Sequence, residues 1–234
     1  MSDPSRIRAD FDRIALLPDG GGIDHNARYH EFLLRHVPRG CGLALDIGCG
    51  KGAFARELAR RSHRTIGIDA SPNMIRIARD QSRDVPNLNF EVADVMTCDL
   101  GDARFDCIAS IATLHHMPPA EVLPRIARAL RPSGVLLVLD LCRSSSLSER
   151  ALDVAALAIG AFTRLIRRRW RVEPAVARAW REHGATDRYH TLPEVRAFCR
   201  AQLPGATVTR HLMWRYSVVW IKPPAPASAI ARRS

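Results

Sequence analysis

Segment 43–59 constrains the fold of this chain more than any other part of the sequence. It begins with a short apolar run at 43–47, carries glycine on three alternate positions, and continues with apolar residues at helical spacing. Glycine tolerates positive φ and has no Cβ, so a ligand can approach the backbone of such a loop, and the first amides of the next helix point toward it. The segment therefore predicts a strand, a ligand-binding loop and a helix. The three glycines are Gly48, Gly50 and Gly52.

Apolar segments with strand character recur after this loop and alternate with segments of helical spacing. The predicted strands are 64–69, 88–94, 105–110 and 135–140, and the predicted helices are 71–83, 119–130 and 193–203. Continuous apolar strands separated by helices are typical of an α/β domain with a parallel sheet that helices cover on both faces. At the C-terminal end of this domain, residues 206–212 and 216–221 predict a β-hairpin.

Helical segments also lie outside this alternation. Residues 1–17 and 23–34 predict helices that precede the sheet, and 148–169 and 173–183 predict helices within an insertion. The apolar centre of the insertion is too short to span a bilayer, so we expect a lid packed on the domain. We divide the chain into a helical cap at 1–39, a main domain at 40–222 with its insertion at about 143–190, and a disordered, Pro/Ala-rich tail at 223–234.

Composition narrows the class of protein. The 234 residues are 47% hydrophobic, which is enough for one core, and no segment has the roughly 20 apolar residues of a membrane span. The first residues lack the pattern of a secretory signal, so we expect a cytoplasmic protein. Six cysteines without a Cys-x-x-Cys pair favour buried free thiols over a metal site or disulfides. The net charge of +11 would attract a polyanion, although its densest cluster, 167–171, is more typical of a solvated helix end.

An acidic residue lies at the end of three successive predicted strands. These residues are Asp46, Asp69 and Asp94. With the glycine loop they make the sequence similar to the class I S-adenosylmethionine-dependent methyltransferases, in particular to their small-molecule group. Residues 46–52 look like the first motif of that family and 67–74 like its second motif. Residues 93–95 match its third site, and 130–135 match the turn into the fifth strand.

The resemblance implies a fold and a reaction. The implied fold is a Rossmann-like three-layer sandwich with a seven-stranded, mostly parallel sheet whose C-terminal hairpin contributes an antiparallel strand. The implied reaction transfers a methyl group from S-adenosylmethionine to a small organic acceptor by direct displacement. Two alternatives stay open, an RNA (tRNA or rRNA) methyltransferase and a protein that binds S-adenosylmethionine without catalysis. An NAD-dependent oxidoreductase is disfavoured because the loop has Gly-x-Gly-x-Gly spacing instead of Gly-x-Gly-x-x-Gly.

The resemblance also implies roles for individual residues. Asp69 is expected to bind the ribose hydroxyls, Asp94 the adenine amino group, and Asp46 the cationic ammonium of the methionine part. Apolar side chains near these acids would form walls for the adenine ring. The expected cofactor residues are Asp46, Gly48, Cys49, Gly50, Gly52, Asp69, Ala70, Met74, Asp94, Val95 and Ile111.

Two histidines follow the fourth predicted strand, where an acceptor would meet the methyl group. His115 and His116 are candidate bases because the pKa of histidine suits proton removal near neutral pH, and His116 is preferred. The helix at 23–34 offers His25, Tyr29 and His30 as candidate contacts to the acceptor. We expect no metal site, and the hairpin and the lid are candidate interfaces for a homodimer.

Overall fold

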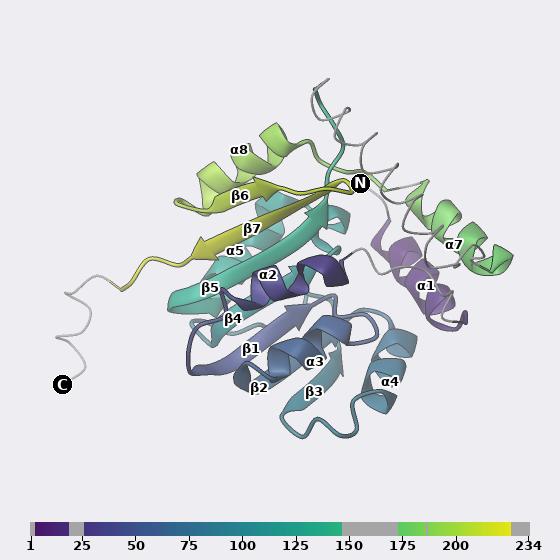
Figure 1. Cartoon of the computed structure of the whole chain (residues 1–234), viewed down its shortest axis with the longest axis horizontal. Coiled ribbons are helices and arrows are strands. Elements are labelled where there is room, and N and C mark those ends of the chain that lie inside the picture. The colour runs from purple at the N-terminus through teal and green to yellow at the C-terminus, as the bar shows by residue number, and fades with distance from the viewer. Residues whose placement is uncertain (1–2, 19–25, 147–172, 186, 226–234) are drawn as a thin grey trace.

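The computed structural model describes residues 3–18, 26–146, 173–185 and 187–225. Seven strands form one sheet in the order β3-β2-β1-β4-β5-β7-β6 (Figure 1). β7 is antiparallel to both of its neighbours, and all other pairs are parallel. This confirms the predicted sheet and its hairpin. The strands are β1 Cys41–Ile47, β2 Ser62–Asp69, β3 Leu88–Val92, β4 Phe105–Ile111, β5 Leu130–Leu141, β6 Thr207–Arg210 and β7 Arg215–Ile221.

Helices connect the strands and precede the sheet. The described helices overlap the predicted segments, except that the short 3-10 helix η2 after β4 was not predicted. The predicted helix at 148–169 and all but the first three residues of the tail at 223–234 lie outside the described residues. The helices are α1 Pro4–Ala15, η1 Ala27–Tyr29, α2 His30–Leu34, α3 Ala53–Ala59, α4 Pro72–Asp80, η2 Leu114–His116, α5 Pro119–Ala129, α7 Pro174–Gly184 and α8 Leu192–Gln202.

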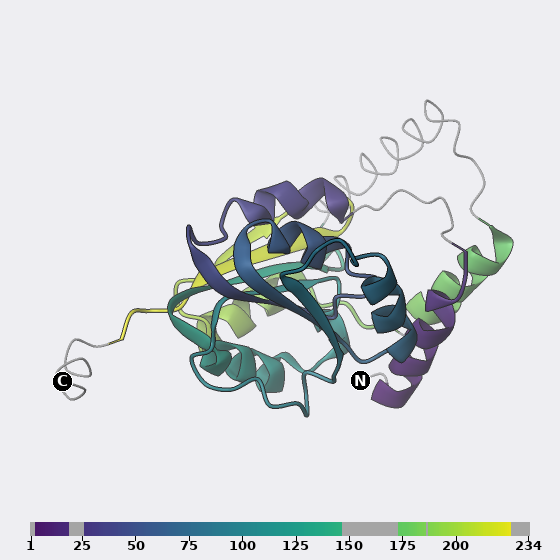
Figure 2. The same ribbon diagram turned by 90° about the horizontal axis from the view of Figure 1, so that it is seen from below.

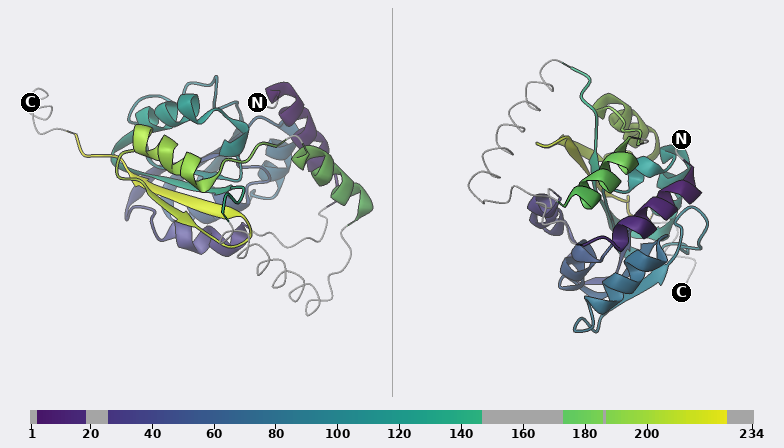
Figure 3. Two further views of the ribbon diagram at one scale, coloured as in Figure 1. Left: turned by 90° about the horizontal axis from the view of Figure 1, so that it is seen from above. Right: turned by 90° about the vertical axis from the view of Figure 1, so that its right-hand side faces the viewer.

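The sheet is the middle layer of a three-layer sandwich, and its strands alternate their side chains between the two outer layers. On β5, Leu136 and Val138 pack with buried residues of α5 and α8, whereas Leu137 and Leu139 face the layer that holds α2 and α3. The two layers lie on opposite sides of the sheet in Figure 3. Burial on both faces explains why this strand is an almost continuous apolar run.

Local sequence signals fix where helices begin beside the sheet. The Ser71 hydroxyl accepts a hydrogen bond from the Met74 amide and Pro72 occupies the first turn, so α4 begins directly after β2. Thr191 and Glu194 form a capping box at the start of α8. The Ser71 cap holds the strand-to-helix connection at the carboxyl end of β2, and the capping box fixes the start of α8 beside the end of β5, where Thr191 pairs with Arg143.

Helices α1 and α7 pack against each other at that same edge of the sheet (Figures 1 and 2). Asp12 of α1 fastens the pair to α4, because its carboxylate accepts hydrogen bonds from the Ser71 hydroxyl at 2.7 Å and the Asn73 amide at 3.0 Å. In the part of the chain that the structure describes, no helix has the length and apolarity needed to cross a bilayer.

At the opposite end of the sheet, the Lys222 side chain links the end of α5 to the start of β5. The Lys222 ammonium donates to the carbonyls of Ala127 at 2.7 Å and Leu130 at 2.6 Å, where α5 ends and β5 begins. Cations stabilise the carbonyls of a final helical turn, and hydrogen bonds to charged groups contribute more than neutral ones.

We expect Lys222→Met to lower the free energy of unfolding by about 1.5–3 kcal/mol, because it leaves these carbonyls without their charged donor. Urea denaturation measures the change. Arg196→Met on the exposed face of α8 is the control and should stay within about 0.5 kcal/mol of the parent. A Lys222 variant as stable as that control would contradict the prediction.

Candidate functional site

The glycine loop is tied to the end of β2 by its own backbone. The amides of Gly48 and Cys49 donate to the Ile68 carbonyl at 2.8 and 3.0 Å. The Gly50 amide donates to the Asp69 carboxylate at 2.9 Å, and the other oxygen of that carboxylate accepts the Ser71 amide at 2.9 Å. Asp69 therefore joins the glycine loop after β1 to the start of α4.

Two of the glycines are required for different reasons. Gly48 has φ +67°, and a Cβ there would lie 2.2 Å from the Thr113 side chain, which packs on the loop. Gly50 has φ +51°, but a Cβ on it would meet nothing within 4 Å. The Thr113 side chain thus fills the space beside Gly48, whereas the space beside Gly50 is free. A ligand can therefore approach the backbone of Gly50.

Asp46 is a buried carboxyl group without a hydrogen-bond partner among the described residues. It lies near the end of β1, its exposed fraction is 1%, and neither of its oxygens is hydrogen-bonded. Burial, with a smaller contribution from the Asp69 charge, raises the pKa of Asp46 to about 8. The backbone amide of Ala55, which is close but makes no hydrogen bond of good geometry, opposes this rise in the pKa only weakly. An unpartnered buried carboxyl group is costly, and a cationic ligand group would compensate for it.

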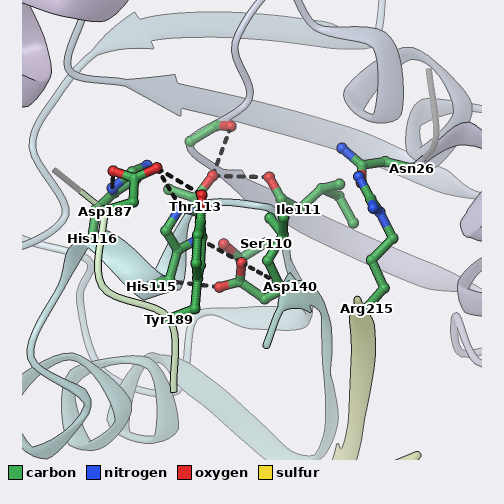
Figure 4. A network of polar contacts seen from close by, with 12 residues as sticks. Asn26, Ser110, Ile111, Thr113, His115, His116, Asp140, Asp187, Tyr189 and Arg215 are labelled. Carbon is green, nitrogen blue, oxygen red and sulfur yellow. Dashed lines mark hydrogen bonds and ion pairs between the residues drawn. The ribbon is translucent and has the colours of Figure 1, made fainter. Parts of the chain in front are cut away.

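A histidine and an aspartate meet at the carboxyl ends of β4 and β5 (Figure 4). The His115 ring Nδ1 lies 2.6 Å from the Asp140 carboxylate, which also accepts the His115 amide at 2.8 Å and the Leu141 amide at 2.7 Å. Both side chains are almost fully buried. Asp140 thereby fixes the orientation of the His115 ring.

Asp187, which follows α7, lies among three imidazole rings. Its oxygens are 3.8 Å from His115 Nε2, 3.6 Å from His116 Nδ1 and 3.6 Å from His183 Nε2. The Tyr189 hydroxyl donates to the same carboxylate at 2.9 Å. Residues from the β4 end and from the segment after α7 therefore form one buried polar cluster.

These neighbours shift the pKa values of the histidines in opposite directions. Burial would lower the pKa of His115, but the carboxylates of Asp140 and Asp187 outweigh it and raise this pKa to about 9. Burial and the adjacent His115 charge lower the pKa of His116 to about 4. In the cluster as it stands, the positive charge resides on His115 and His116 is neutral.

Comparisons with known proteins agree with this arrangement of strands and loops. A family model described as a methyltransferase domain matches residues 45–138. An uncharacterized methyltransferase of Mycobacterium tuberculosis strain H37Rv is 32% identical over 202 residues, which cover 85% of this chain and 96% of that protein. The chain belongs to the class I S-adenosylmethionine-dependent methyltransferases.

A second relative and a solved structure extend the comparison. The 27-O-demethylrifamycin SV methyltransferase of Amycolatopsis mediterranei strain S699 is 33% identical over 159 residues, 58% of each chain. The N-methyltransferase NodS of Bradyrhizobium japonicum WM9, solved with S-adenosyl-L-homocysteine, aligns over 93% of this chain and 98% of its own with a TM-score of 0.63. At 17% identity, that likeness shows the fold alone.

S-adenosylmethionine is the methyl donor of this methyltransferase, and the geometry of the loop fits it. The orphaned, buried Asp46 carboxyl group suits the ammonium of the methionine part. The accessible backbone at Gly50 suits a ligand that lies against the loop. Both features lie at the carboxyl end of β1, where the strand order reverses and ligands bind in open α/β sheets.

The structure places the other predicted cofactor residues along the same edge. Asp94 is exposed, and its carboxylate accepts the Met96 amide at 2.8 Å. Met74 is buried against Ile14 and Ala15 of α1. The remaining residues of the set are partly or fully buried. Cys49, Gly52, Ala70 and Val95 lie in the connections after β1, β2 and β3, and Ile111 is the last residue of β4.

The predicted acceptor contacts separate in the structure. His25 lies outside the described residues. The Tyr29 hydroxyl donates to the Leu212 carbonyl at 3.1 Å, in the turn between β6 and β7. His30 lies 3.2 Å from the Glu57 carboxylate and packs on Phe54, so its partners are on α3 and not in the histidine cluster.

Sequence reasoning overlooked several members of the cluster. Asp140, like Asp69, is an acidic residue at the end of an apolar strand, so the pattern that identified Asp69 also identifies Asp140. His183 and Asp187 lie in the predicted lid, and no local pattern relates them to His115. They enter the site because α7 packs beside α1 at the carboxyl edge of the sheet.

The raised pKa of Asp46 has a consequence for stability. An unfolded aspartate ionises near about 3.9, whereas folded Asp46 retains its proton to about 8, so the folded state binds more protons between these values. The contribution of Asp46 to stability is therefore fully present below about pH 4 and is lost as pH rises toward 8.

We expect Asp46→Asn, which cannot ionise, to remove this loss in the cofactor-free protein. The difference in unfolding free energy between the variant and the parent should increase in favour of the variant up to about pH 8 and then level off. Urea titrations at several pH values measure it, with exposed Asp102→Asn as the control. A difference that does not vary between about pH 5 and 8 would count against the raised pKa.

Proposed function

We propose that this methyltransferase methylates a hydroxyl oxygen of a small organic acceptor. The observation that carries the proposal is the buried pair of His115 and Asp140, with 2.6 Å between Nδ1 and Oδ1 at the carboxyl edge of the sheet. The neighbouring His116 Nε2 is buried and has no hydrogen-bond partner among the described residues. An acceptor oxygen at this edge would meet imidazole nitrogens that protein groups already orient.

A hydroxyl acceptor needs a nearby nitrogen that can accept its proton more than other acceptors do. The sulfonium is already a strong electrophile, so the enzyme chiefly aligns donor and acceptor and excludes water. In the proposed step the acceptor oxygen bonds to the methyl carbon while the carbon–sulfur bond breaks, and that electron pair stays on sulfur. The hydroxyl proton passes to Nε2 of His116, the neutral imidazole of the cluster, whereas a thioether or neutral amine attacks without first losing a proton. The products are a methyl ether and S-adenosylhomocysteine.

The surroundings of the histidines favour a small acceptor. The Phe11 ring of α1 lies 5.5 Å from the His116 ring and 4.5 Å from the His183 ring, so α1 covers the cluster from one side. The rifamycin relative supports an oxygen acceptor, because its name describes an acceptor that lacks an O-methyl group. The cap at 1–39 and the insertion at about 143–190 are the segments that we propose to shape the acceptor pocket.

We propose that the strand-end acids hold the cofactor as the sequence motifs predict. Both oxygens of Asp69 already accept backbone amides, and each has a further lone pair for a ribose hydroxyl. The exposed Asp94 would accept from the adenine amino group, and Asp46 from the ammonium. Val95 and Met74 are buried and, as the motifs predict, would contact the adenine ring.

We also propose a cytoplasmic location for this methyltransferase. All six cysteines are free thiols, which suits a cytoplasmic location. An RNA acceptor stays the alternative, but the basic cluster at 167–171 on which it depends lies outside the described residues. A homodimer through the hairpin or the insertion also stays a prediction.

The acceptor class is tested with radiolabelled S-adenosylmethionine and matched acceptors that differ in one hydroxyl, amine or thiol group, with tRNA alongside. We expect transfer to the hydroxyl compounds and a product heavier by one methylene. Asp140→Asn should lower kcat roughly 10²-fold while the affinity for S-adenosylmethionine is unchanged, because the oriented histidine is lost and the cofactor contacts are not. Asp102→Asn is the surface control. Transfer confined to tRNA, or cofactor binding without transfer to any acceptor, would contradict the proposal.

The cofactor assignment is tested separately by calorimetry. Asp69→Ala should abolish detectable binding of S-adenosylhomocysteine while circular dichroism shows a retained fold, because the ribose hydroxyls lose their acceptor. Asp69→Asn keeps one acceptor oxygen at the same position and should bind more weakly than the parent but measurably. Near-normal affinity in Asp69→Ala would refute the assignment.

A further inference from the structure

The buried histidine cluster has the composition and spacing of a metal site. His115, His116 and Asp187 each offer one ligand atom, and these atoms all lie within 4.8 Å of one another. His183 Nε2 is 3.6 Å from the same carboxylate. Imidazole nitrogens with a carboxylate oxygen are the donor set that zinc and similar divalent metals favour.

The distances fit shared coordination better than direct hydrogen bonding. The three nitrogen-to-oxygen separations at Asp187 are 3.6–3.8 Å, longer than hydrogen bonds. Ligands of a tetrahedral zinc ion, at about 2.0–2.1 Å from the metal, lie about 3.3–3.4 Å apart. The three nitrogen-to-oxygen distances are therefore within a few tenths of an ångström of ligand spacing, whereas the ligand atoms of the set as a whole lie within 4.8 Å of one another, so the rings would also move inward on binding.

One buried carboxylate oxygen of the cluster points independently to a cation. Asp187 Oδ1 has no hydrogen-bond partner among the described residues, although its side chain is only 3% exposed. A buried carboxylate oxygen without a donor is costly, and a bound cation would satisfy it. Histidine rings and a tyrosine hydroxyl surround the Asp187 carboxylate, and no ion pair between this carboxylate and a lysine or arginine is found among the described residues.

The surroundings of the cluster are those of a supported metal site. Asp140 binds Nδ1 of His115 at 2.6 Å, which leaves Nε2 facing Asp187. Metal-binding histidines commonly direct their second nitrogen to a carboxylate in this way. Tyr189 holds the Asp187 carboxylate in turn, and the Phe11 ring covers the cluster from α1. The ligand atoms are thus oriented and shielded from water.

We propose that His115, His116 and Asp187, with His183 as a fourth ligand, bind one divalent transition-metal ion of the zinc class. This departs from the expectation that the chain has no metal site, which considered the cysteines and not the histidines. Its consequence for catalysis rests on the proposed function, because a cation at this edge would lower the pKa of an acceptor hydroxyl there. Metal binding itself does not depend on that function.

The proposal is tested by titrating the chelator-treated full chain with Co²⁺, whose visible absorption reports the geometry of its ligands. We expect saturable binding of one ion per chain with a four- or five-coordinate spectrum, and displacement by Zn²⁺. Asp187→Asn and His116→Gln should each weaken Co²⁺ binding at least about tenfold, and Asp140→Asn roughly 10–100-fold. His63→Gln, an exposed histidine of β2, is the matched control and should bind like the parent.

Circular dichroism of each variant shows whether a loss of binding reflects unfolding, and His116→Gln tests the site if Asp187→Asn does not fold. The proposal is overturned if the folded parent binds no Co²⁺ saturably, or if folded cluster variants bind it like the parent. Methyl transfer is measured on the same samples. Hydroxyl methylation by a protein that binds no metal overturns this inference and leaves the proposed function standing. Saturable Co²⁺ binding without transfer to any hydroxyl acceptor supports the metal site and overturns the proposed function.

Discussion

The parallel pairing of β1 with both β2 and β4 determines where a ligand can bind in this fold. From β1 the chain extends to one side through β2 and β3, and then returns to the other side through β4 and β5. The connecting helices therefore lie on opposite faces, and a crevice forms between them at the carboxyl ends of the central strands. The glycine loop, Asp69 and His115 all follow strand ends, so they lie together because the strands do.

Buried polar groups at this edge differ in how well the protein satisfies them, and the difference separates structural from ligand-binding roles. Asp140 accepts three hydrogen bonds from His115 and Leu141, so its charge is supported by the protein alone. Asp46 has no such bond among the described residues, and its pKa is raised accordingly. A fold that retains an unsatisfied carboxyl group at its ligand-binding edge loses stability there, and the free energy of cofactor binding compensates for that loss.

Features set by local sequence were predictable, and features set by distant packing were not. The strands and the glycine loop follow from apolar periodicity and from glycine positions, which act over a few residues. Asp140 was within reach of the rule that identified Asp69. The meeting of His115 with Asp187 joins segments about 70 residues apart in the chain, and it depends on how α7 packs on α1. The place of His30 before the loop suggested an acceptor contact, but the sequence did not show that tertiary packing would direct its ring toward Glu57.

Helix α1 connects the two halves of the site through adjacent residues. Asp12 accepts hydrogen bonds from Ser71 and Asn73 at the start of α4, immediately after the acid proposed to bind the ribose. Phe11, one position earlier, packs on the rings of His116 and His183 at the acceptor side. Because both contacts belong to adjacent residues of one short helix, a displacement of α1 from the histidine cluster would also disturb its hydrogen bonds to α4. The cover over the acceptor side and the support of the cofactor side are therefore mechanically coupled in this structure.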